Sequence, residues 1–145
     1  VLVLRKPVPP QVLTESGIII DGAASYSPLV SRHSQAPIVH AVISCKWTLR
    51  SDRAQNARSE ALNLIRNRKG RTPHIVVVTG EPMPSRLASL ALGTGDIDTM
   101  YHFALSELVE ATRASRNAEA MKTLDNLING QRLRDIADLP LDLAI

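Results

Sequence analysis

The stretch AVISCKWTLRSDRAQNARSEALNLIRNRKG, at positions 41–70, joins a short apolar segment to a segment rich in arginine. The apolar part predicts a strand over 38–47, along which side chains alternate between two faces. Ser44 and Lys46 therefore share one face, and Cys45 points to the other. This pattern puts the Lys46 ammonium beside a serine hydroxyl at a strand end, where side chains become accessible.

The arginine-rich part predicts a helix. Its N-terminal cap is expected to be Ser51 or Asp52, because a hydroxyl or a carboxylate there accepts hydrogen bonds from the first turn. The helix is expected to run to about Arg68 and to stop at Gly70, since glycine adopts the left-handed conformation that ends many helices.

The apolar residues of this helix fall on one stripe at about 100° per residue: Ala57, Ala61, Leu64 and Ile65. Glu60 lies at the edge of that stripe. Arg53, one heptad earlier, lies within about 20° of Glu60 around the helix axis. A carboxylate and a guanidinium are therefore expected on the helix edge that turns toward the preceding strand.

The flanking sequence completes an alternation of strands and helices. Residues 75–78 are all apolar, which predicts a central strand over 73–82 that is buried on both faces. A loop is expected at PVPPQ, residues 7–11, and a short helix or loop follows residue 82. The remaining elements are expected to be strands at 1–6 and 17–21, an edge strand at 98–103, and helices at about 104–116 and 118–128. This order predicts an α/β domain with a mixed central β-sheet flanked by helices.

Basic charge is concentrated in one part of the chain. Residues 44–71 hold eight cationic residues against two acidic ones, a local excess of six, whereas the whole chain has a formal net charge of +3. Cys45 is the only cysteine, which excludes an internal disulfide and fits a reducing compartment. No apolar run approaches the roughly 20 residues that cross a bilayer.

Lys46 and Glu60 supply part of what phosphodiester hydrolysis needs. That reaction uses a divalent cation, held by carboxylate and carbonyl oxygens, and a positive charge near the attacking water. The Cys45 carbonyl lies between Ser44 and Lys46 and adds one oxygen. The alternative is structural: a strand-end lysine whose stem packs on the sheet, and a helix salt bridge from Glu60.

The sequence Arg-Ser-Asp-Arg at 50–53 is suited to reading bases. Arginine donates two hydrogen bonds to guanine, and aspartate accepts from the cytosine amino group. Arg50, Asp52 and Arg53 at a helix start thus favour recognition of G·C pairs in a major groove. The alternative is that Asp52 serves the first turn of the helix and the arginines are solvated.

Three segments closely resemble the type II restriction endonucleases of the NgoMIV type: SCKWTLRSDRAQNARSEALNLIRNRKG at 44–70, PHIVVVTGEPMPSR at 73–86, and LPLDLAI at 139–145. These enzymes belong to the PD-(D/E)XK nuclease superfamily, in the branch that reads a CCGG core, here within GCCGGC. The resemblance covers almost the whole chain. It implies a restriction-endonuclease-like core built on the mixed sheet.

In this branch, serine replaces the acidic residue two positions before the lysine, which matches Ser44 and Lys46. The metal-binding role passes to a glutamate on the following helix, which matches Glu60. The resemblance therefore implies Lys46, Glu60 and Ser44 as catalytic residues. It implies Mg²⁺ as the cofactor, held by Glu60 and the backbone carbonyl of Cys45.

The family's base-reading element of arginine, any residue, acid and arginine matches Arg50, Asp52 and Arg53. Arg86, after a proline turn, matches a position that reaches the outer base pair; its alternative is a solvated arginine at a helix start. The other basic residues are expected to contact phosphates without reading sequence, or to be plain solvated charge: Arg58, Arg66, Arg68, Lys69 and Arg71.

One expected residue lies outside the chain. By alignment to the family, the first metal-binding aspartate of the PD motif falls immediately before Val1. Residues 1–145 are therefore expected to be a single catalytic-core fragment, without the N-terminal part of a longer chain. Asp21 looks superficially like a substitute, but its position matches a different segment of the family. Such a fragment is expected to bind metal weakly and to cleave poorly or not at all.

The resemblance implies a Mg²⁺-dependent type II site-specific deoxyribonuclease that hydrolyses double-stranded DNA at a G·C-rich palindrome. One alternative is a truncated, catalytically impaired fragment that still binds DNA. Another is a repair or recombination nuclease that reads DNA structure on the same core. A palindromic site implies a symmetric homodimer or homotetramer, and the setting implied is the cytoplasm of a prokaryotic cell, without a membrane partner.

Overall fold

The structure is a computed structural model that describes residues 1–20, 22, 25–93 and 95–144. The chain divides into two compact units. The smaller unit is Leu2–Ala41, and the larger unit is Val1 together with Val42–Ile145. Each unit is described by itself.

The strands form one sheet in the order β1-β2-β3-β4-β5, namely β1 Leu2–Arg5, β2 Ile38–Lys46, β3 His74–Thr79, β4 Thr99–His102 and β5 Leu133–Asp135. β4 pairs in parallel with both β3 and β5. Val1 and Ile43 exchange both of their backbone hydrogen bonds, at 2.7 and 2.8 Å, which is the pattern of an antiparallel pair. The sheet is therefore mixed, as predicted.

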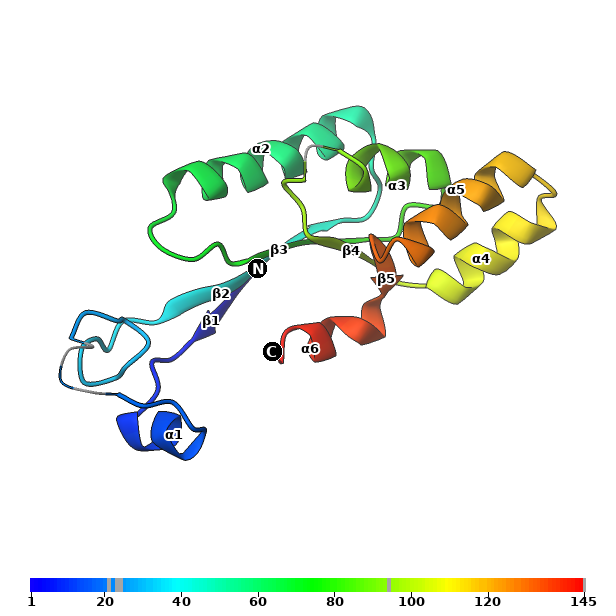
Figure 1. Ribbon diagram of the computed structural model, residues 1–145. Helices are drawn as coiled ribbons and strands as arrows, with labels where there is room; N and C mark the ends of the chain where they lie inside the picture. The colour runs from blue at the N-terminus through cyan, green and yellow to red at the C-terminus, as the bar shows by residue number, and fades with distance from the viewer. Residues whose placement is uncertain (21, 23–24, 94, 145) are drawn as a thin grey trace. The chain divides into compact units, whose positions relative to one another are not determined.

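Helices flank the strands of the larger unit: α2 Ser51–Asn67, α3 Pro84–Ala91, α4 Leu105–Ala114, α5 Ala118–Asn129 and α6 Leu139–Asp142. In Figure 1, α2 and α3 run along one side of β3 and β4, and α6 lies on the other side. A 3₁₀ turn, Ile136–Asp138, connects β5 to α6. Across the described ranges, every helix is too short or too polar to span a membrane.

The core of the larger unit follows the alternation of β3. Ile75 and Val77 belong to the main apolar cluster with residues of α2, α3 and α5, whereas Val76 and Val78 pack with Tyr101 on the opposite face. A strand covered on both faces needs apolar residues at every position. The prediction of a buried central strand over 73–82 is thus confirmed for His74–Thr79.

One expectation for the larger unit is wrong, and one of its strands was not predicted. The strand expected at the sheet edge, 98–103, is β4, and it lies between β3 and β5. β5 lies at the end of the strand order next to β4, and the sequence did not predict this strand. A strand of only three residues is too short to show a periodic pattern.

Two expectations for the smaller unit are also wrong. The loop expected at 7–11 contains the start of α1, Pro10–Glu15. Pro10 is the first helical residue, where its fixed φ suits the helix and its missing N–H costs no hydrogen bond. The run expected as a strand at 17–21 is not a strand over 18–20, and Ile19 is 91% exposed. Strand propensity depends on a neighbouring strand and a packed face.

Candidate active site and nucleic-acid interface

β2 presents Ser44 and Lys46 to the helix that follows it. Ile43, between Val42 and Ser44, packs with the apolar cluster on the opposite face of the sheet. Because side chains alternate along a strand, Ser44 and Lys46 face α2. The Lys46 side chain is 21% exposed, so its stem is largely packed while its ammonium remains available.

The Glu60 carboxylate joins these two side chains. The Ser44 hydroxyl donates to Glu60 Oε2 at 2.9 Å, and Lys46 Nζ donates to Glu60 Oε1 at 3.1 Å. The helix therefore brings Glu60 to the strand side chains, as the edge of the apolar stripe suggested. The side chain of Glu60 is still 56% exposed, which leaves the carboxylate accessible to a ligand.

The partners of Glu60 set its ionisation. Burial acts to raise the pKa of the Glu60 carboxyl, but the hydrogen bonds from Ser44 and Lys46 outweigh it, with help from the Lys46 charge. The pKa of Glu60 is thus lowered below its ordinary value. A carboxylate that stays ionised at moderately acidic pH suits a metal ligand.

The atoms expected to hold Mg²⁺ are all oxygens, which suits a hard cation. Glu60 offers carboxylate oxygens with lone pairs beyond those used by Ser44 and Lys46. Cys45 lies between these two residues on β2, and its thiol is free and exposed. Within the described residues, no three side chains of His, Cys, Asp or Glu form a metal-binding group. These oxygens fit Mg²⁺ as part of a ligand set, with water completing it. Asp21 lies outside the described residues.

The residues expected to read bases begin α2. Arg50 is the N-cap residue, with no capping hydrogen bond from its side chain, and Ser51 and Asp52 form the first turn. The expectation that Ser51 or Asp52 caps the helix is therefore wrong, because the helix starts one residue earlier. Arg53 Nη1 donates to Thr48 Oγ1 at 3.0 Å, which holds its guanidinium against the segment before the helix.

The end of α2 agrees with the sequence. The helix stops at Asn67, with Arg68 as its C-cap, and Gly70 has a φ of 85°. The guanidinium groups of Arg58 and Arg68 each donate to a backbone carbonyl. The Arg58 guanidinium donates to the Ser89 carbonyl of α3, and the Arg68 guanidinium donates to the Ile65 carbonyl.

Arg86 lies in α3 and pairs with a buried carboxylate. Its Nη1 atom is 3.5 Å from Glu81 Oε1; the Arg86 side chain is 42% exposed, and that of Glu81 is fully buried. Arg50 and Arg86 line the same cavity, of about 410 Å³, together with Leu49, Ser51, Ala54 and Ser89. The structure thus brings the first α2 residues and Arg86 to one concave surface.

Glu81 is the functional candidate that the sequence analysis missed. Its position carried a usable signal, because a carboxylate directly after a buried apolar strand needs partners in the fold. No local spacing indicates which partners these are. They come from the segment before α2 and from the start of α3.

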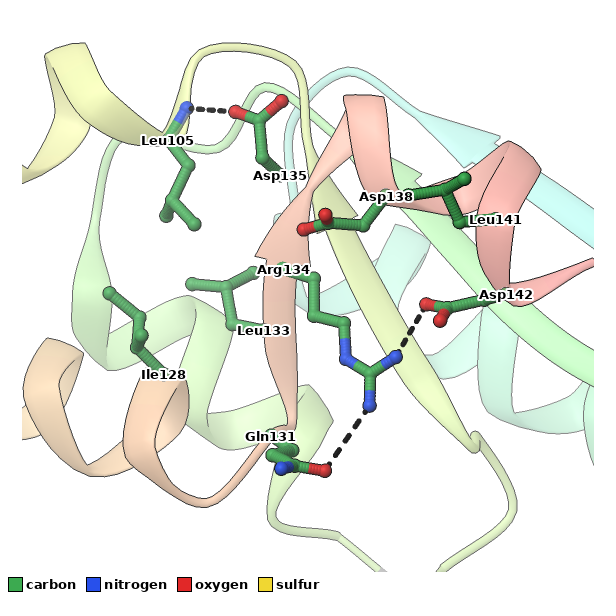
Figure 2. Close-up of a pocket in the computed structure, with 9 residues that line it drawn as sticks. All are labelled: Leu105, Ile128, Gln131, Leu133, Arg134, Asp135, Asp138, Leu141 and Asp142. Atoms are coloured by element: carbon green, nitrogen blue, oxygen red, sulfur yellow. Dashed lines mark hydrogen bonds and ion pairs between the residues drawn. The ribbon is translucent and has the colours of Figure 1, made fainter.

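A second cavity, of about 380 Å³, lies near the C-terminal end of the chain (Figure 2). Two of its charged side chains are paired with each other: Arg134 donates to Asp142 at 2.5 Å, and it also donates to the Gln131 side chain at 3.3 Å. Asp135 accepts from the Leu105 N–H at 3.3 Å. None of the residues expected in the active site lines this cavity.

Comparison with known proteins identifies the family. The family described as NgoMIV restriction enzyme matches residues 1–145. The chain is 52% identical over 146 residues to the type II restriction enzyme NgoMIV of Neisseria gonorrhoeae, covering 100% of this chain and 51% of that protein. The chain therefore spans about half the length of that relative.

Among solved structures, the chain is similar to restriction endonuclease PspGI in a complex with substrate DNA. That match has a TM-score of 0.46 and 19% identity, and it covers 72% of this chain and 39% of the other. The family match over the whole chain confirms the resemblance that the residues between Ser44 and Arg86 carry. The chain belongs to the NgoMIV restriction enzyme family.

Proposed function

We propose that this chain carries the catalytic core of a Mg²⁺-dependent type II restriction endonuclease that hydrolyses double-stranded DNA. One observation carries the proposal: Lys46 and Ser44 on β2 both bond to Glu60 on α2, in a chain that belongs to this enzyme family. An ammonium group on a strand and a carboxylate on a helix, held together at an exposed point, are part of what this hydrolysis requires.

Each residue of the cluster has a distinct task in the proposal. Lys46 positions the attacking water and places positive charge near the scissile phosphate. Glu60 and the Cys45 carbonyl hold the metal ion, and Ser44 orients Glu60 through its hydroxyl. Bound Mg²⁺ supplies neutralisation of the charge developing on the phosphate and a lower pKa for water.

Base reading is assigned to the start of α2 and to α3. Arg50 and Arg53 donate to guanine, Asp52 accepts from cytosine, and Arg86 reaches the outer base pair. The target proposed from the family resemblance is GCCGGC. The shared cavity of Arg50 and Arg86 supports this assignment, because both cations are presented from one surface.

The remaining features of the enzyme follow from its target. A palindromic site is read by a two-fold symmetric assembly, so the protein is proposed to be a homodimer or homotetramer. Its substrate is DNA in the cytoplasm of a prokaryotic cell.

The proposal includes a second carboxylate upstream of Val1, as the family resemblance implies. Val1 pairs with Ile43, so a residue joined to the amino side of Val1 in the natural protein would lie beside Ser44. A carboxylate from that strand would complete the metal ligands that Glu60 and Cys45 begin. Without that second carboxylate, Glu60 would be the one carboxylate of the proposed metal site. That case favours the alternative, a fragment that binds DNA without cutting it.

The test is cleavage of a plasmid with a single GCCGGC site, with Mg²⁺, by the natural protein. We expect cleavage at that site, and we expect Lys46→Ala to reduce the rate at least about 100-fold while binding in Ca²⁺ persists. Lys122→Ala is the matched control, since Lys122 is an exposed cation on α5 and has no part in the proposed site.

Two results would replace this proposal with an alternative. Binding of DNA by the natural protein without cleavage supports the impaired binding fragment. For the repair or recombination nuclease, the discriminating variant is Arg50→Ala. A base reader loses about 1–3 kcal/mol at one base pair, whereas a reader of DNA structure loses affinity equally on all sequences.

A further inference from the structure

Glu81 is a charged side chain without solvent exposure, directly after β3. Its carboxylate has partners on both sides. Oε2 accepts from the Leu49 N–H at 2.6 Å, and Oε1 accepts from the Met83 N–H at 3.1 Å. The same Oε1 lies 3.5 Å from Arg86 Nη1.

These partners lead to the two elements that carry the proposed base readers. Leu49, 2% exposed, immediately precedes Arg50, the N-cap residue of α2. Met83 is the N-cap residue of α3, and Arg86 lies in the first turn of that helix. A single carboxylate therefore holds the entry to α2, the entry to α3 and the Arg86 guanidinium.

The chemistry of a buried charge makes this arrangement rigid. A carboxylate removed from water is costly unless hydrogen bonds and a cation satisfy it, so the loss of one partner disturbs the others. The pairing also directs Arg86 along α3 toward the cavity that it shares with Arg50. An arginine without this partner would sample many rotamers in solvent.

We propose that Glu81 is a positioning residue for base recognition, which holds Arg86 and the segment entering α2 in one arrangement so that the two readers act together. The inference rests on the proposed function, because it takes Arg50 and Arg86 to contact bases. It adds a residue that touches no DNA and controls specificity through those that do.

The test is Glu81→Gln in the natural protein, with equilibrium binding measured in Ca²⁺. The probes are a duplex with GCCGGC, one with its outer base pair changed and one of unrelated sequence. We expect the affinity ratio between the first two to fall at least about fivefold, while affinity for the unrelated duplex stays the same. A merely structural role would lower the melting temperature or weaken all three affinities equally, and would leave the ratio unchanged.

Asp135→Asn is the matched control. Asp135 also accepts hydrogen bonds from two backbone N–H groups, that of Leu105 (Figure 2) and that of Ala137. Neither partner is a proposed base reader. We expect this variant to lose stability and keep the affinity ratio. A ratio in Glu81→Gln equal to that of the unmodified protein overturns the inference. Equal binding of all three duplexes by the unmodified protein overturns the proposed function itself.

A second route avoids any change at Glu81, in case Glu81→Gln does not fold. Arg86→Ala alters a partly exposed side chain and leaves Glu81 without its cation. If Glu81 links the readers, Arg86→Ala also lowers discrimination at the inner base pair read by Arg50. The double variant with Arg50→Ala then loses less than the product of the two single losses. Losses that multiply independently overturn the inference.

Discussion

At the residue scale, the Glu60 carboxylate is divided between two donors on β2. Oε2 accepts from Ser44 at 2.9 Å, and Oε1 accepts from Lys46 at 3.1 Å. An acid in place of Ser44 would set a second negative charge beside Glu60 and raise the pKa of the pair. A hydroxyl donates a hydrogen bond instead, which helps to hold the pKa of Glu60 below its ordinary value.

Ser44→Ala is therefore expected to shift the pH dependence of cleavage. The pKa of Glu60 is lowered in the folded protein, so its carboxylate persists as the pH falls. Loss of the Ser44 hydrogen bond raises that pKa, and the acidic limb of the activity profile moves to higher pH. We also expect a loss of about 10- to 100-fold at neutral pH, because an orienting partner is removed. The measurement is kcat/KM against pH with Mg²⁺.

The control for this change is Ser106→Ala. Ser106 donates to Glu107 at 2.8 Å and lowers the pKa of its carboxyl, so the pair repeats the serine-to-glutamate contact on α4. Neither residue belongs to the proposed site. An unshifted profile for Ser44→Ala, or an equal shift for Ser106→Ala, would contradict the role assigned to Ser44.

At the element scale, α2 approaches the sheet through small side chains. Its buried residues are Ala54, Ala57 and Ala61, and Leu64 and Ile65 pack against the same core. Alanines allow the helix backbone to lie close to its neighbours, and this closeness brings Glu60 within hydrogen-bonding distance of Lys46. The position of Glu60 in the proposed site therefore depends on how closely α2 packs against the sheet.

Ala57→Leu is expected to disturb both the packing of α2 and the geometry of the proposed site. Ala57 is 2% exposed, so a larger side chain overpacks the core and destabilises the protein by about 1–3 kcal/mol. It also displaces α2 from β2, so cleavage falls more than the fraction of folded protein does. The measurements are urea unfolding and cleavage under conditions where the variant is folded. Gln55→Leu, on the exposed side of α2, should change neither quantity appreciably.

At the scale of the whole larger unit, apolar clusters cover both faces of the sheet, and a polar cluster ties β4, β5 and α6 together. The Tyr101 hydroxyl donates to Asp142 at 2.6 Å, and Arg134 pairs with the same carboxylate. Burial, then the hydrogen bond to Asp142, raises the pKa of Tyr101 above its ordinary value of 10.0. The bond from Tyr101 and then that from Arg134 lower the pKa of Asp142.

This cluster predicts a loss of stability at alkaline pH. The tyrosine ionises near pH 10.0 in the unfolded chain but only at higher pH in the folded protein. The unfolded state therefore releases a proton first, and stability falls above pH 10 by up to about 1.4 kcal/mol per pH unit. Tyr101→Phe should remove this slope and cost about 1 kcal/mol at neutral pH. Tyr26→Phe, at a side chain 95% exposed, is the control.

Denaturant unfolding from pH 8 to pH 11 measures the effect. Identical slopes for the unmodified protein and Tyr101→Phe would show that the tyrosine is not protected in the fold. A reduced slope for Tyr26→Phe as well would assign the effect to a general property of tyrosine residues.

The periodicity of apolar and polar residues in the sequence predicted the main features of β2, α2 and β3. The alternation of side chains along β2 predicted that Ser44 and Lys46 share one face of the strand. The 3.6-residue repeat of α2 placed Glu60 at the edge of its apolar stripe. The unbroken apolar run of β3 predicted a central strand. The family was also readable, because its motif residues stand at fixed spacings. These features depend on residues close together in the chain, where backbone geometry alone decides which side chains share a face.

Only the tertiary structure decided which distant segments meet. β4 is an inner strand because the three-residue β5 pairs with it. No pattern in the sequence of either strand predicts that pairing. Arg58 bonds to a carbonyl of α3, and Glu81 finds its partners at Leu49, Met83 and Arg86. Such contacts form when packing brings together residues that are far apart in the sequence. A buried charged group then forms hydrogen bonds with the donors that the packing places beside it. The periodicity of the sequence determines which residues of a helix or strand share a face. The tertiary packing determines which distant residues contact that face.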